Sequence, residues 1–314
     1  MTDQIDVIIP VYHPDQKLET LIHRLNGQTR KPHHIWFLQT MSEPDEDKRV
    51  KAVLERAEHA SVIPVAKEEF DHGGTRRQGA MLSKADYMLF MTQDAVPVDD
   101  RLIETLYGCF SSDRGIAVAY GRQLPDENVG VIERYTRNFN YPETSFVKDK
   151  GDLKRMGIKT YFCSNVCAMY RRDLYEELGG FVSRTIFNED MIFASSVIGA
   201  GYKIAYAAQA VVVHAHKYSY RQQLTRNFDL GVSQRQYRGI FEDVKSESEG
   251  MRLVKDTAKY LLKRGKWYLI PDLVIQSACK LIGYKLGLRY EKLPAGIVKR
   301  LSMNKAYFEK GEDV

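Results

Sequence analysis

Three short stretches place acidic or imidazole side chains beside runs of apolar residues. "MLFMTQDAVP" contains the single acid Asp94, "RTIFNEDMIF" contains the adjacent acids Glu189 and Asp190, and "VVVHAHKY" contains His214 and His216. A carboxylate and an imidazole can hold a divalent cation together with phosphate oxygens. A further carboxylate can take a proton from an attacking group. These stretches therefore predict metal-assisted group transfer, with Asp94 and His214 as metal ligands and a general base in the acidic pair.

Each stretch also has a simpler interpretation. Asp94 can cap the turn before Pro97, and acids at a helix N-terminus are favoured by the helix dipole alone. A histidine beside a buried run is commonly a packing residue. On a strand, however, His214 and His216 would point to the same face, which favours a ligand role for one of them.

The stretch "FDHGGTRRQGA" (70–80) has the composition of an anion site. Two glycines let a backbone approach a ligand closely, and we expect Thr75 to cap a helix whose N-terminus favours an anion. Arg76 and Arg77 add positive charge that suits a phosphate. The simpler alternative is a loop and helix cap with surface arginines.

Strand-like and helix-like segments alternate through the first half of the chain, which predicts βαβ units and a parallel sheet with helices on both faces. The expected strands are 5–12, 33–40, 61–70 and 87–94, and the expected helices are 17–30, 45–59 and 74–86. Ligands bind beyond the carboxyl ends of such strands, where Tyr12, Gln39 and Gln93 stand. Neither of the usual glycine-rich nucleotide motifs, G-x-G-x-x-G and G-x-x-x-x-G-K-[ST], occurs.

The second half has a less regular pattern. A helix at 100–110 and a strand at 115–122 precede a long polar and aromatic stretch, 123–160, for which the sequence predicts no regular element. A strand at 165–170, helices at 171–178 and 189–200 and a strand at 210–218 follow, and the chain is mainly helical from 221.

The 314 residues allow one large domain or a domain with a helical appendage. The four cysteines show no disulfide or zinc spacing, so we expect buried thiols in a reducing compartment. The N-terminus predicts no signal peptide, and no apolar run is long enough to span a membrane.

The charge is unevenly distributed. The net charge is +5, but residues 251–300 hold 12 Lys and Arg against 3 Asp and Glu, which leaves about −4 for the remainder. This asymmetry favours a nucleic acid or an anionic membrane as partner. In 271–288 a narrow polar stripe of Asp272, Gln276 and Lys280 is surrounded by apolar positions, with Trp267 and Tyr268 before it. We expect membrane-surface binding, and the alternative is packing on the catalytic domain or in a homodimer.

Six motifs in order over about residues 5–220 resemble the inverting family-2 glycosyltransferases of the GT-A fold: "IDVIIPVY", "HGGTRRQG", "TQDAVP", "SNVCAMYRRDLYEELGGF", "NEDMIF" and "VVVHAH". "FDHGGTRRQGA" with "LFMTQDAVP" is most similar to bacterial rhamnosyltransferases that use dTDP-L-rhamnose. The tail "KLIGYKLGLRYEKLP" resembles those that build rhamnose-rich wall polysaccharides in Gram-positive bacteria.

The resemblance implies an α/β fold with a mostly parallel central sheet and a C-terminal helical extension. The catalytic domain would span 1–220, with a nucleotide-sugar half at about 1–122 and an acceptor half at about 123–220, and 221–314 would contact a membrane or a second copy. The enzyme would be peripheral on the inner face of the cell membrane. It would bind dTDP-L-rhamnose, a lipid-linked acceptor and Mg²⁺ or Mn²⁺, but no nucleic acid.

The resemblance also implies a role for each matching residue. Pro10, Tyr12 and Gln39 would lie near the base, and Thr75, Arg76, Gly79 and Gln93 near the nucleotide and its diphosphate. Asp94 would hold the metal, Asp190 would be the base assisted by Glu189, and Ser164, Asn165 and Gly180 would shape the sugar and acceptor pocket. The motif carries one acid where many relatives have two, which gives His214 more weight.

Other function classes remain open from the sequence. One is transfer from another nucleotide sugar. A nucleotidyltransferase would need a glycine-rich loop with an activating basic residue after the first strand, and "PVYHPDQ" lacks it. A binding module without catalysis is disfavoured by the intact acids and His214.

Overall fold

The computed structural model describes residues 3–242 and 247–309, and within them a nine-stranded sheet has the order β3-β2-β1-β4-β8-β6-β9-β5, with β7 beside β9. The first four long strands are β1 (Ile5–Val11), β2 (His34–Thr40), β3 (Ala60–Val65) and β4 (Tyr87–Met91). They pair in parallel, as the alternating pattern predicts. Their carboxyl ends therefore lie along one edge of the sheet.

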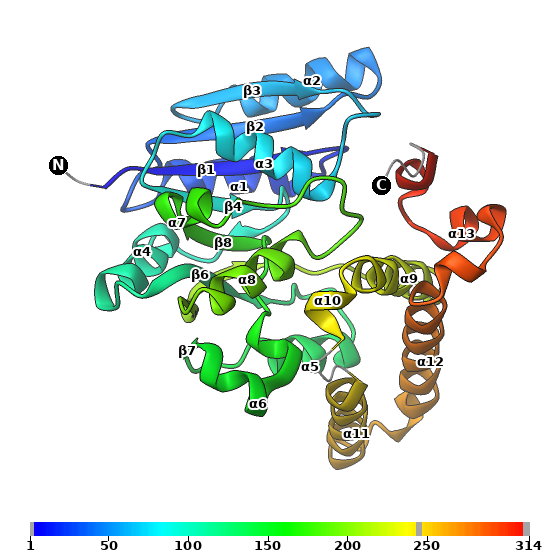
Figure 1. Ribbon diagram of the computed structural model, residues 1–314. Coiled ribbons are helices and arrows are strands. Elements are labelled where there is room, and N and C mark those ends of the chain that lie inside the picture. The colour runs from blue at the N-terminus through cyan, green and yellow to red at the C-terminus, as the bar shows by residue number, and fades with distance from the viewer. Residues whose placement is uncertain (1–2, 243–246, 310–314) are drawn as a thin grey trace.

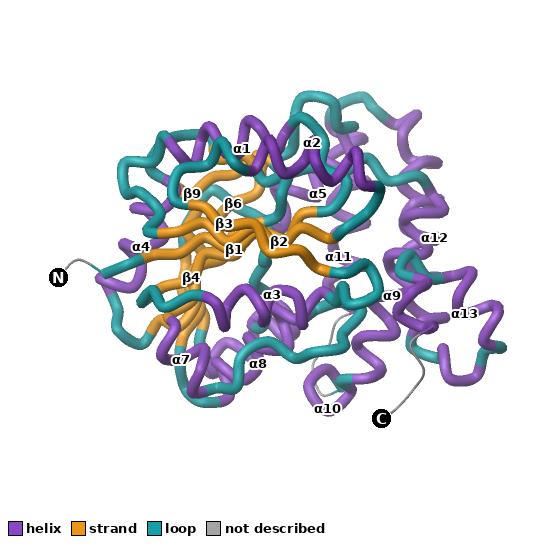
Figure 2. Tube along the Cα trace, turned by 90° about the horizontal axis from the view of Figure 1, so that it is seen from above, coloured by secondary structure: helices purple, strands orange, loops and turns teal. Residues whose placement is uncertain are grey.

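Helices cover both faces of this sheet. The connections are α1 (Lys17–Asn26), α2 (Pro44–Leu54) and α3 (His72–Leu82); α1 and α2 lie on one face, and α3 lies on the other (Figure 2). Val7 and Ile9 of β1 belong to the core beneath α1, whereas Ile8 belongs to the core beneath α3. Burial on both faces explains why β1 is apolar at nearly every position.

The second half of the sheet is mixed in direction. Its elements are β5 (Val96–Pro97), α4 (Leu102–Ser112), β6 (Ile116–Leu124), β7 (Phe146–Lys148), β8 (Cys167–Arg171), α7 (Arg172–Glu177), α8 (Glu189–Gly199) and β9 (Lys203–Val213). β8 is antiparallel to both β4 and β6, and β6 is parallel to β9. β8 and β6 separate β4 from β9, but the short strand β5 pairs with the end of β9. This pairing brings the turn between β4 and β5 close to the segment that follows β9.

Two sequence expectations need correction here. The last strand runs over 203–213 rather than 210–218, because its first half, "KIAYAAQ", buries small alanines that give little strand signal. The 123–160 stretch is not a plain loop, since it contains α5 (Val131–Asn140), β7 and α6 (Leu153–Met156).

The C-terminal helices lie to one side of the α/β body (Figure 1). They are α9 (Tyr220–Gln236), α10 (Arg238–Phe241), α11 (Glu247–Lys263), α12 (Ile270–Gly287) and α13 (Ala295–Leu301), in agreement with the mainly helical expectation. Residues 1–2, 243–246 and 310–314 of the predicted regions lie outside the described residues.

Helices α9 and α12 pack unusually closely. A Cβ added to Gly283 or Gly287 would lie 2.1 Å from a backbone carbonyl oxygen of α9. Glycine is therefore required for these two backbones to approach each other. Among the described residues, no helix combines the length and the hydropathy that crossing a bilayer would require. All four cysteines are free, and Cys163 and Cys167 are buried as expected, whereas Cys109 and Cys279 are only partly buried.

Candidate active site

Asp94 lies in the turn after β4 and faces both histidines. Its Oδ2 is 3.5 Å from Nε2 of His214 and 3.4 Å from Nε2 of His216. One ligand atom from each residue can be chosen so that all lie within 4.8 Å of one another. The histidines follow the end of β9 rather than forming part of it, so the expected strand geometry is wrong, but both still reach the carboxylate.

Gln123, at the end of β6, fixes the orientation of His214. Its Oε1 accepts a hydrogen bond from Nη1 of Arg137 at 2.5 Å and lies 3.2 Å from Nδ1 of His214. A guanidinium can only donate hydrogen bonds, so the Gln123 atom that faces Arg137 and His214 is the amide oxygen. Because this oxygen can only accept, Nδ1 of His214 carries the proton that points toward it. Burial keeps the pKa of His214 well below its ordinary value, so the ring is neutral. Its Nε2 therefore presents a lone pair to Asp94.

This arrangement fits a divalent cation. Nε2 of His214 and Oδ2 of Asp94 both present lone pairs, and the two atoms are 3.5 Å apart. Burial also lowers the pKa of His216, which favours its neutral, ligating form. One carboxylate with two imidazoles is a mixed oxygen and nitrogen set, which suits Mn²⁺ better than Mg²⁺ because Mg²⁺ prefers oxygen ligands.

The two acids stand in the first turn of α8, where Asn165 contacts both. Nδ2 of Asn165 donates to Oε1 of Glu189 at 3.1 Å, and its backbone N–H donates to Oδ2 of Asp190 at 3.2 Å. The hydroxyl of Tyr170 donates to Oδ1 of Asn165 at 2.7 Å, which sets the orientation of the amide. Asn165 thus holds the carboxylates of both acids in place.

Glu189 and Asp190 have different electrostatic environments. Nη1 of Arg76 lies 3.2 Å from Oε1 of Glu189, and both side chains are buried. Burial, followed by the nearby charge of Glu189, raises the pKa of Asp190 to about 7. Asp190 is therefore the member of the pair whose proton affinity suits a general base near neutral pH.

The anion stretch differs from expectation at its helix cap. Asp71 caps α3, and its Oδ1 accepts from the backbone N–H of Gly74 at 2.5 Å. Thr75 is buried inside the helix, where its Oγ1 accepts from the backbone N–H of Asp71 at 3.2 Å. The expected cap at Thr75 is wrong because both glycines belong to the helix. A Cβ on Gly73 would lie 1.9 Å from the carbonyl oxygen of Val182, so this turn must carry glycine.

Three further predicted residues have packing or pairing roles. Arg76 is committed to Glu189 and to the carbonyl oxygen of His72, at 2.9 Å. A Cβ on Gly79 would lie 2.5 Å from Cγ2 of Ile8, so Gly79 lets α3 approach the sheet. Gly180 has a φ of +68° and lies against the ring of Tyr175.

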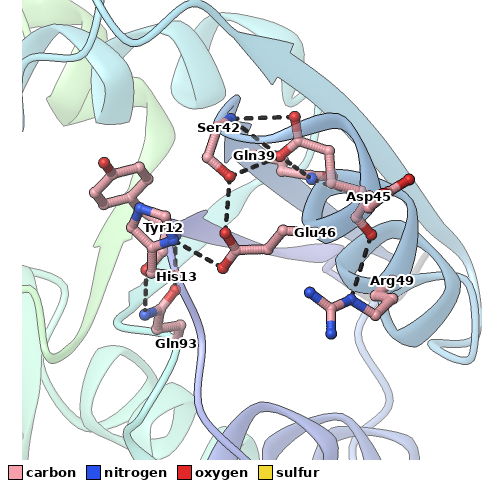
Figure 3. A network of polar contacts seen from close by, with 9 residues as sticks. Tyr12, His13, Gln39, Ser42, Asp45, Glu46, Arg49 and Gln93 are labelled. Carbon is pink, nitrogen blue, oxygen red and sulfur yellow. Dashed lines mark hydrogen bonds and ion pairs between the residues drawn. The ribbon is translucent and has the colours of Figure 1, made fainter.

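Tyr12 and Gln93 join the ends of β1 and β4. The backbone N–H of Tyr12 donates to Oε1 of Gln93 at 2.8 Å, and Nε2 of Gln93 donates to the carbonyl oxygen of Tyr12 at 2.9 Å (Figure 3). The ring of Tyr12 is exposed and Pro10 is half-buried. An exposed aromatic ring at this edge is suited to stacking on a base.

Gln39, predicted to lie near the base, has a structural contact at the end of β2. It is buried, and its Nε2 donates to the carbonyl oxygen of Asp47 at 3.2 Å, which ties the end of β2 to α2. Beside it, Nδ1 of His13 lies 2.7 Å from Oε1 of Glu46 (Figure 3). His13 has a φ of +42°, an unusual conformation for a residue with a side chain.

Sequence reasoning missed Gln123 and Arg137 as site residues. Oγ of Ser164, a predicted site residue, accepts from Nε2 of Gln123 at 3.1 Å, so Gln123 connects Ser164 with His214. The available signal was a polar residue at the end of the strand "IAVAYGRQL", but the sequence does not reveal that this strand lies beside β9.

Comparison with known proteins identifies a family and two relatives that match nearly the whole chain. Residues 6–179 match the family described as glycosyl transferase family 2. The O-antigen chain rhamnosyltransferase WbaN of Salmonella anatum is 36% identical over 305 residues, which cover 96% of this chain and 95% of that protein. The O-antigen chain rhamnosyltransferase RfbN of Salmonella typhimurium is 38% identical over 307 residues, with 97% and 96% covered.

Solved structures share the fold at low identity. The mannosyltransferase PcManGT of Pyrobaculum calidifontis, in complex with GDP-Man and Mn²⁺, has a TM-score of 0.57 at 13% identity and covers 98% of this chain and 86% of that one. TarS 1–349 of S. aureus, in complex with UDP-GlcNAc, has a TM-score of 0.54 at 13% identity, with 92% and 91% covered.

Proposed function

This chain belongs to glycosyltransferase family 2 and has the GT-A fold, and we propose that it transfers L-rhamnose from dTDP-β-L-rhamnose to a hydroxyl of an O-antigen-type polysaccharide precursor on a lipid carrier. The choice of rhamnose as the transferred sugar is supported by the similarity, over nearly the full length, to two proteins named O-antigen chain rhamnosyltransferases. Their names favour an O-antigen chain over the Gram-positive wall polysaccharide that the tail suggests.

In this proposal the nucleotide lies across the carboxyl ends of β1 to β4, with its base near the exposed ring of Tyr12. Asp94, His214 and His216 would hold a divalent cation, Mn²⁺ in preference to Mg²⁺, which supplies neutralisation of the charge that develops on the departing diphosphate. Residues 1–122 would thus bind the donor, and residues 123–220 would shape the acceptor side.

Asp190 would take the proton of the acceptor hydroxyl. Its Oδ2 accepts one hydrogen bond from Asn165 and its Oδ1 one from the backbone N–H of Met191, which leaves lone pairs for an incoming hydroxyl. The acceptor oxygen then bonds to C1 of rhamnose, the bond from C1 to the diphosphate oxygen breaks, and dTDP leaves. Single displacement inverts the anomeric centre, so a β-linked donor gives an α-L-rhamnoside.

The buried pair with Arg76 gives Glu189 a supporting role in this reaction. Its carboxylate is held by Arg76 and Asn165 and adds to the proton affinity of Asp190. Glu189 thus assists the base without itself receiving the proton.

The donor assignment is tested by incubating the protein with Mn²⁺ and separate nucleotide sugars: dTDP-L-rhamnose, GDP-mannose and UDP-GlcNAc. We expect release of nucleoside diphosphate from dTDP-L-rhamnose at least about tenfold faster than from the others, since a site built to pair with the polar groups of one donor strongly rejects analogues that leave those groups unpaired. Preferential release of GDP or UDP would reject dTDP-L-rhamnose as donor.

Membrane attachment is a second part of the proposal. The polar residues of α12 face the protein: Oδ1 of Asp272 accepts from the hydroxyl of Tyr220 at 2.6 Å, and burial lowers the pKa of Lys280. The opposite, exposed face of α12 is apolar. This face, termed here the α12 stripe, consists of Val274, Ile275, Ala278, Leu281 and Ile282.

The surroundings of the α12 stripe favour an anionic lipid surface. Trp267 and Tyr268 are 69% and 60% exposed at its N-terminal end. Exposed cations flank both ends: Lys263 and Arg264 before it, and Lys285 and Arg289 after it. An apolar helix face with interfacial aromatic residues and basic flanks is typical of helices that lie in the headgroup region. The protein would thus be peripheral on the inner face of the membrane, held by residues 221–314.

Flotation with vesicles containing anionic phosphatidylglycerol tests this attachment. We expect the wild-type protein to float, and the variant Ile275→Glu/Ile282→Glu to stay in the lower fraction. Val147→Glu, on the exposed edge strand β7, is the matched control and should float. Loss of a dimer in the double variant, measured by light scattering, without any flotation of the wild type would assign the stripe to a homodimer instead.

A further inference from the structure

Arg226 lies in the second turn of α9, between the two parts of the candidate site. Its Cζ is 4.7 Å from the ring centroid of Phe187 and 5.7 Å from that of Tyr218. Phe187 is two residues before Glu189, and the ring of Tyr218 lies 5.4 Å from that of His216. Arg226 is therefore adjacent both to the segment that delivers the acids and to the segment that delivers the histidines.

Two other cations near this site have acidic partners. Lys17 lies 3.5 Å from Asp126, and Arg137 lies 3.1 Å from Glu133. Within residues 3–242 and 247–309, Arg226 forms no ion pair. Asp229, one turn further along α9, instead accepts from the backbone N–H of Met303 at 2.9 Å. Arg226 is thus a half-buried cation with aromatic neighbours, and it has no ion pair within the described residues.

The position of Arg226 suits an anionic ligand. Aromatic faces stabilise a guanidinium but do not accept its N–H groups in the plane, so these donors stay available. A planar guanidinium next to a divalent-cation site can bind two oxygens of one phosphate group.

We propose that Arg226 binds the diphosphate of the donor nucleotide sugar, so that the C-terminal helical region completes the donor site. The nature of this anion rests on the proposed glycosyl transfer. The boundary expected at residue 220 would then separate two parts of the chain that act on one ligand. Arg226 would neutralise part of the charge on the leaving diphosphate, and helix α9 would hold it in place through its close packing on α12.

The test measures binding to Arg226→Gln, Arg226→Lys and the matched control Arg221→Gln, which removes an exposed arginine from the same helix. Calorimetric titrations in Mn²⁺ would use dTDP, inorganic pyrophosphate and thymidine. We expect Arg226→Gln to weaken dTDP and pyrophosphate binding by about 10- to 100-fold, as loss of a charge-assisted hydrogen bond does. Thymidine binding should not change, Arg226→Lys should be intermediate, and Arg221→Gln should match the wild type.

Other results would overturn the proposal. If Arg226→Gln binds dTDP and pyrophosphate as Arg221→Gln does, Arg226 does not hold the donor diphosphate. If Arg226→Gln left nucleotide binding unchanged and raised only the KM for the lipid-linked acceptor, Arg226 would bind the acceptor's phosphate. This result would also overturn the proposal. If the variant loses pyrophosphate binding but the wild type does not hydrolyse dTDP-L-rhamnose, the donor assignment fails while the role of Arg226 in diphosphate binding stands.

Discussion

The side chains of Arg76 and Glu189 form a buried ion pair, with Nη1 of Arg76 3.2 Å from Oε1 of Glu189. The pair joins α3, from the nucleotide half of the sheet, to the first turn of α8. It also gives the two adjacent acids different surroundings, because Glu189 has a cationic partner whereas Asp190 forms no ion pair within the described residues. Arg76 thus contacts Glu189 directly, and, against the larger effect of burial, its charge also lowers the pKa of Asp190.

Replacing Arg76 by methionine should destabilise the protein by about 3 kcal/mol, because it leaves the charge of Glu189 buried and unpaired. The double variant Arg76→Met/Glu189→Gln should recover part of this loss, since no unpaired charge remains. Urea unfolding of the two single variants and the double variant measures the coupling. Full stability of Arg76→Met with loss of dTDP binding would instead make Arg76 a phosphate ligand.

Asp190→Asn should reduce kcat by at least about 100-fold, because general base catalysis typically contributes a factor of this size. Binding of dTDP should be nearly unchanged, since Asp190 acts on the acceptor. Steady-state rates and calorimetric titration with dTDP give the two quantities. The introduced amide can still accept hydrogen bonds, so the local contacts of residue 190 should largely persist. If dTDP affinity and rate fell together, Asp190 would organise the donor site rather than accept a proton.

The pH dependence of kcat/KM should show activity rising with pH through about 7, because the deprotonated Asp190 is the active form and burial raises its pKa to about 7. The raised pKa of Asp190 also makes the stability of the folded protein depend on pH. The folded state binds this proton more tightly than the unfolded chain, so its stabilising contribution is complete below about pH 4 and is lost as the pH rises through about 7.

Asp190→Asn should therefore unfold at a higher temperature than the wild type at pH 8, with a smaller difference at pH 5. Differential scanning calorimetry at both pH values measures this. If kcat/KM instead rose around pH 4, Asp190 would have an ordinary carboxyl pKa in the folded enzyme.

Gln123→Leu should weaken Mn²⁺ binding by about 10- to 100-fold, because His214 loses the acceptor that fixes its protonated nitrogen. Electron paramagnetic resonance of free Mn²⁺ gives the affinity without any turnover. Gln78→Leu, which changes an exposed glutamine on α3, is the control. Equal Mn²⁺ affinity in both variants would mean that Asp94 and His216 hold the ion without help from the His214 orientation.

Gly283→Ala should destabilise the C-terminal helices, because the new methyl group would lie 2.1 Å from the carbonyl oxygen of Leu224. Overpacking of this kind typically costs about 1–3 kcal/mol. Gly108→Ala in α4, where the added Cβ would meet no other segment of the chain within 4 Å, should be neutral or slightly stabilising. Chemical unfolding of both variants compares them, and similar midpoints would contradict the close packing of α9 on α12.

The sequence by itself determined the local elements and the acids that end them. The apolar run of β1 and the alternation of strands with helices depend on neighbours along the chain, so their pattern predicts the parallel half of the sheet. The same logic identified Asp94 beyond β4 and the acidic pair at the start of α8. Local pattern misplaced the cap of α3, since it does not reveal that Gly73 must approach Val182.

Only the tertiary structure decided which side chains meet. Gln123 and His214 are 91 positions apart, and their contact exists because β6 lies beside β9. Both histidines reach Asp94 although the strand ends before them. The periodicity of α12 showed a polar and an apolar side, but packing on α9 turned the polar side inward. Such pairings depend on contacts between distant segments, and the pattern of a single segment carries no information about them.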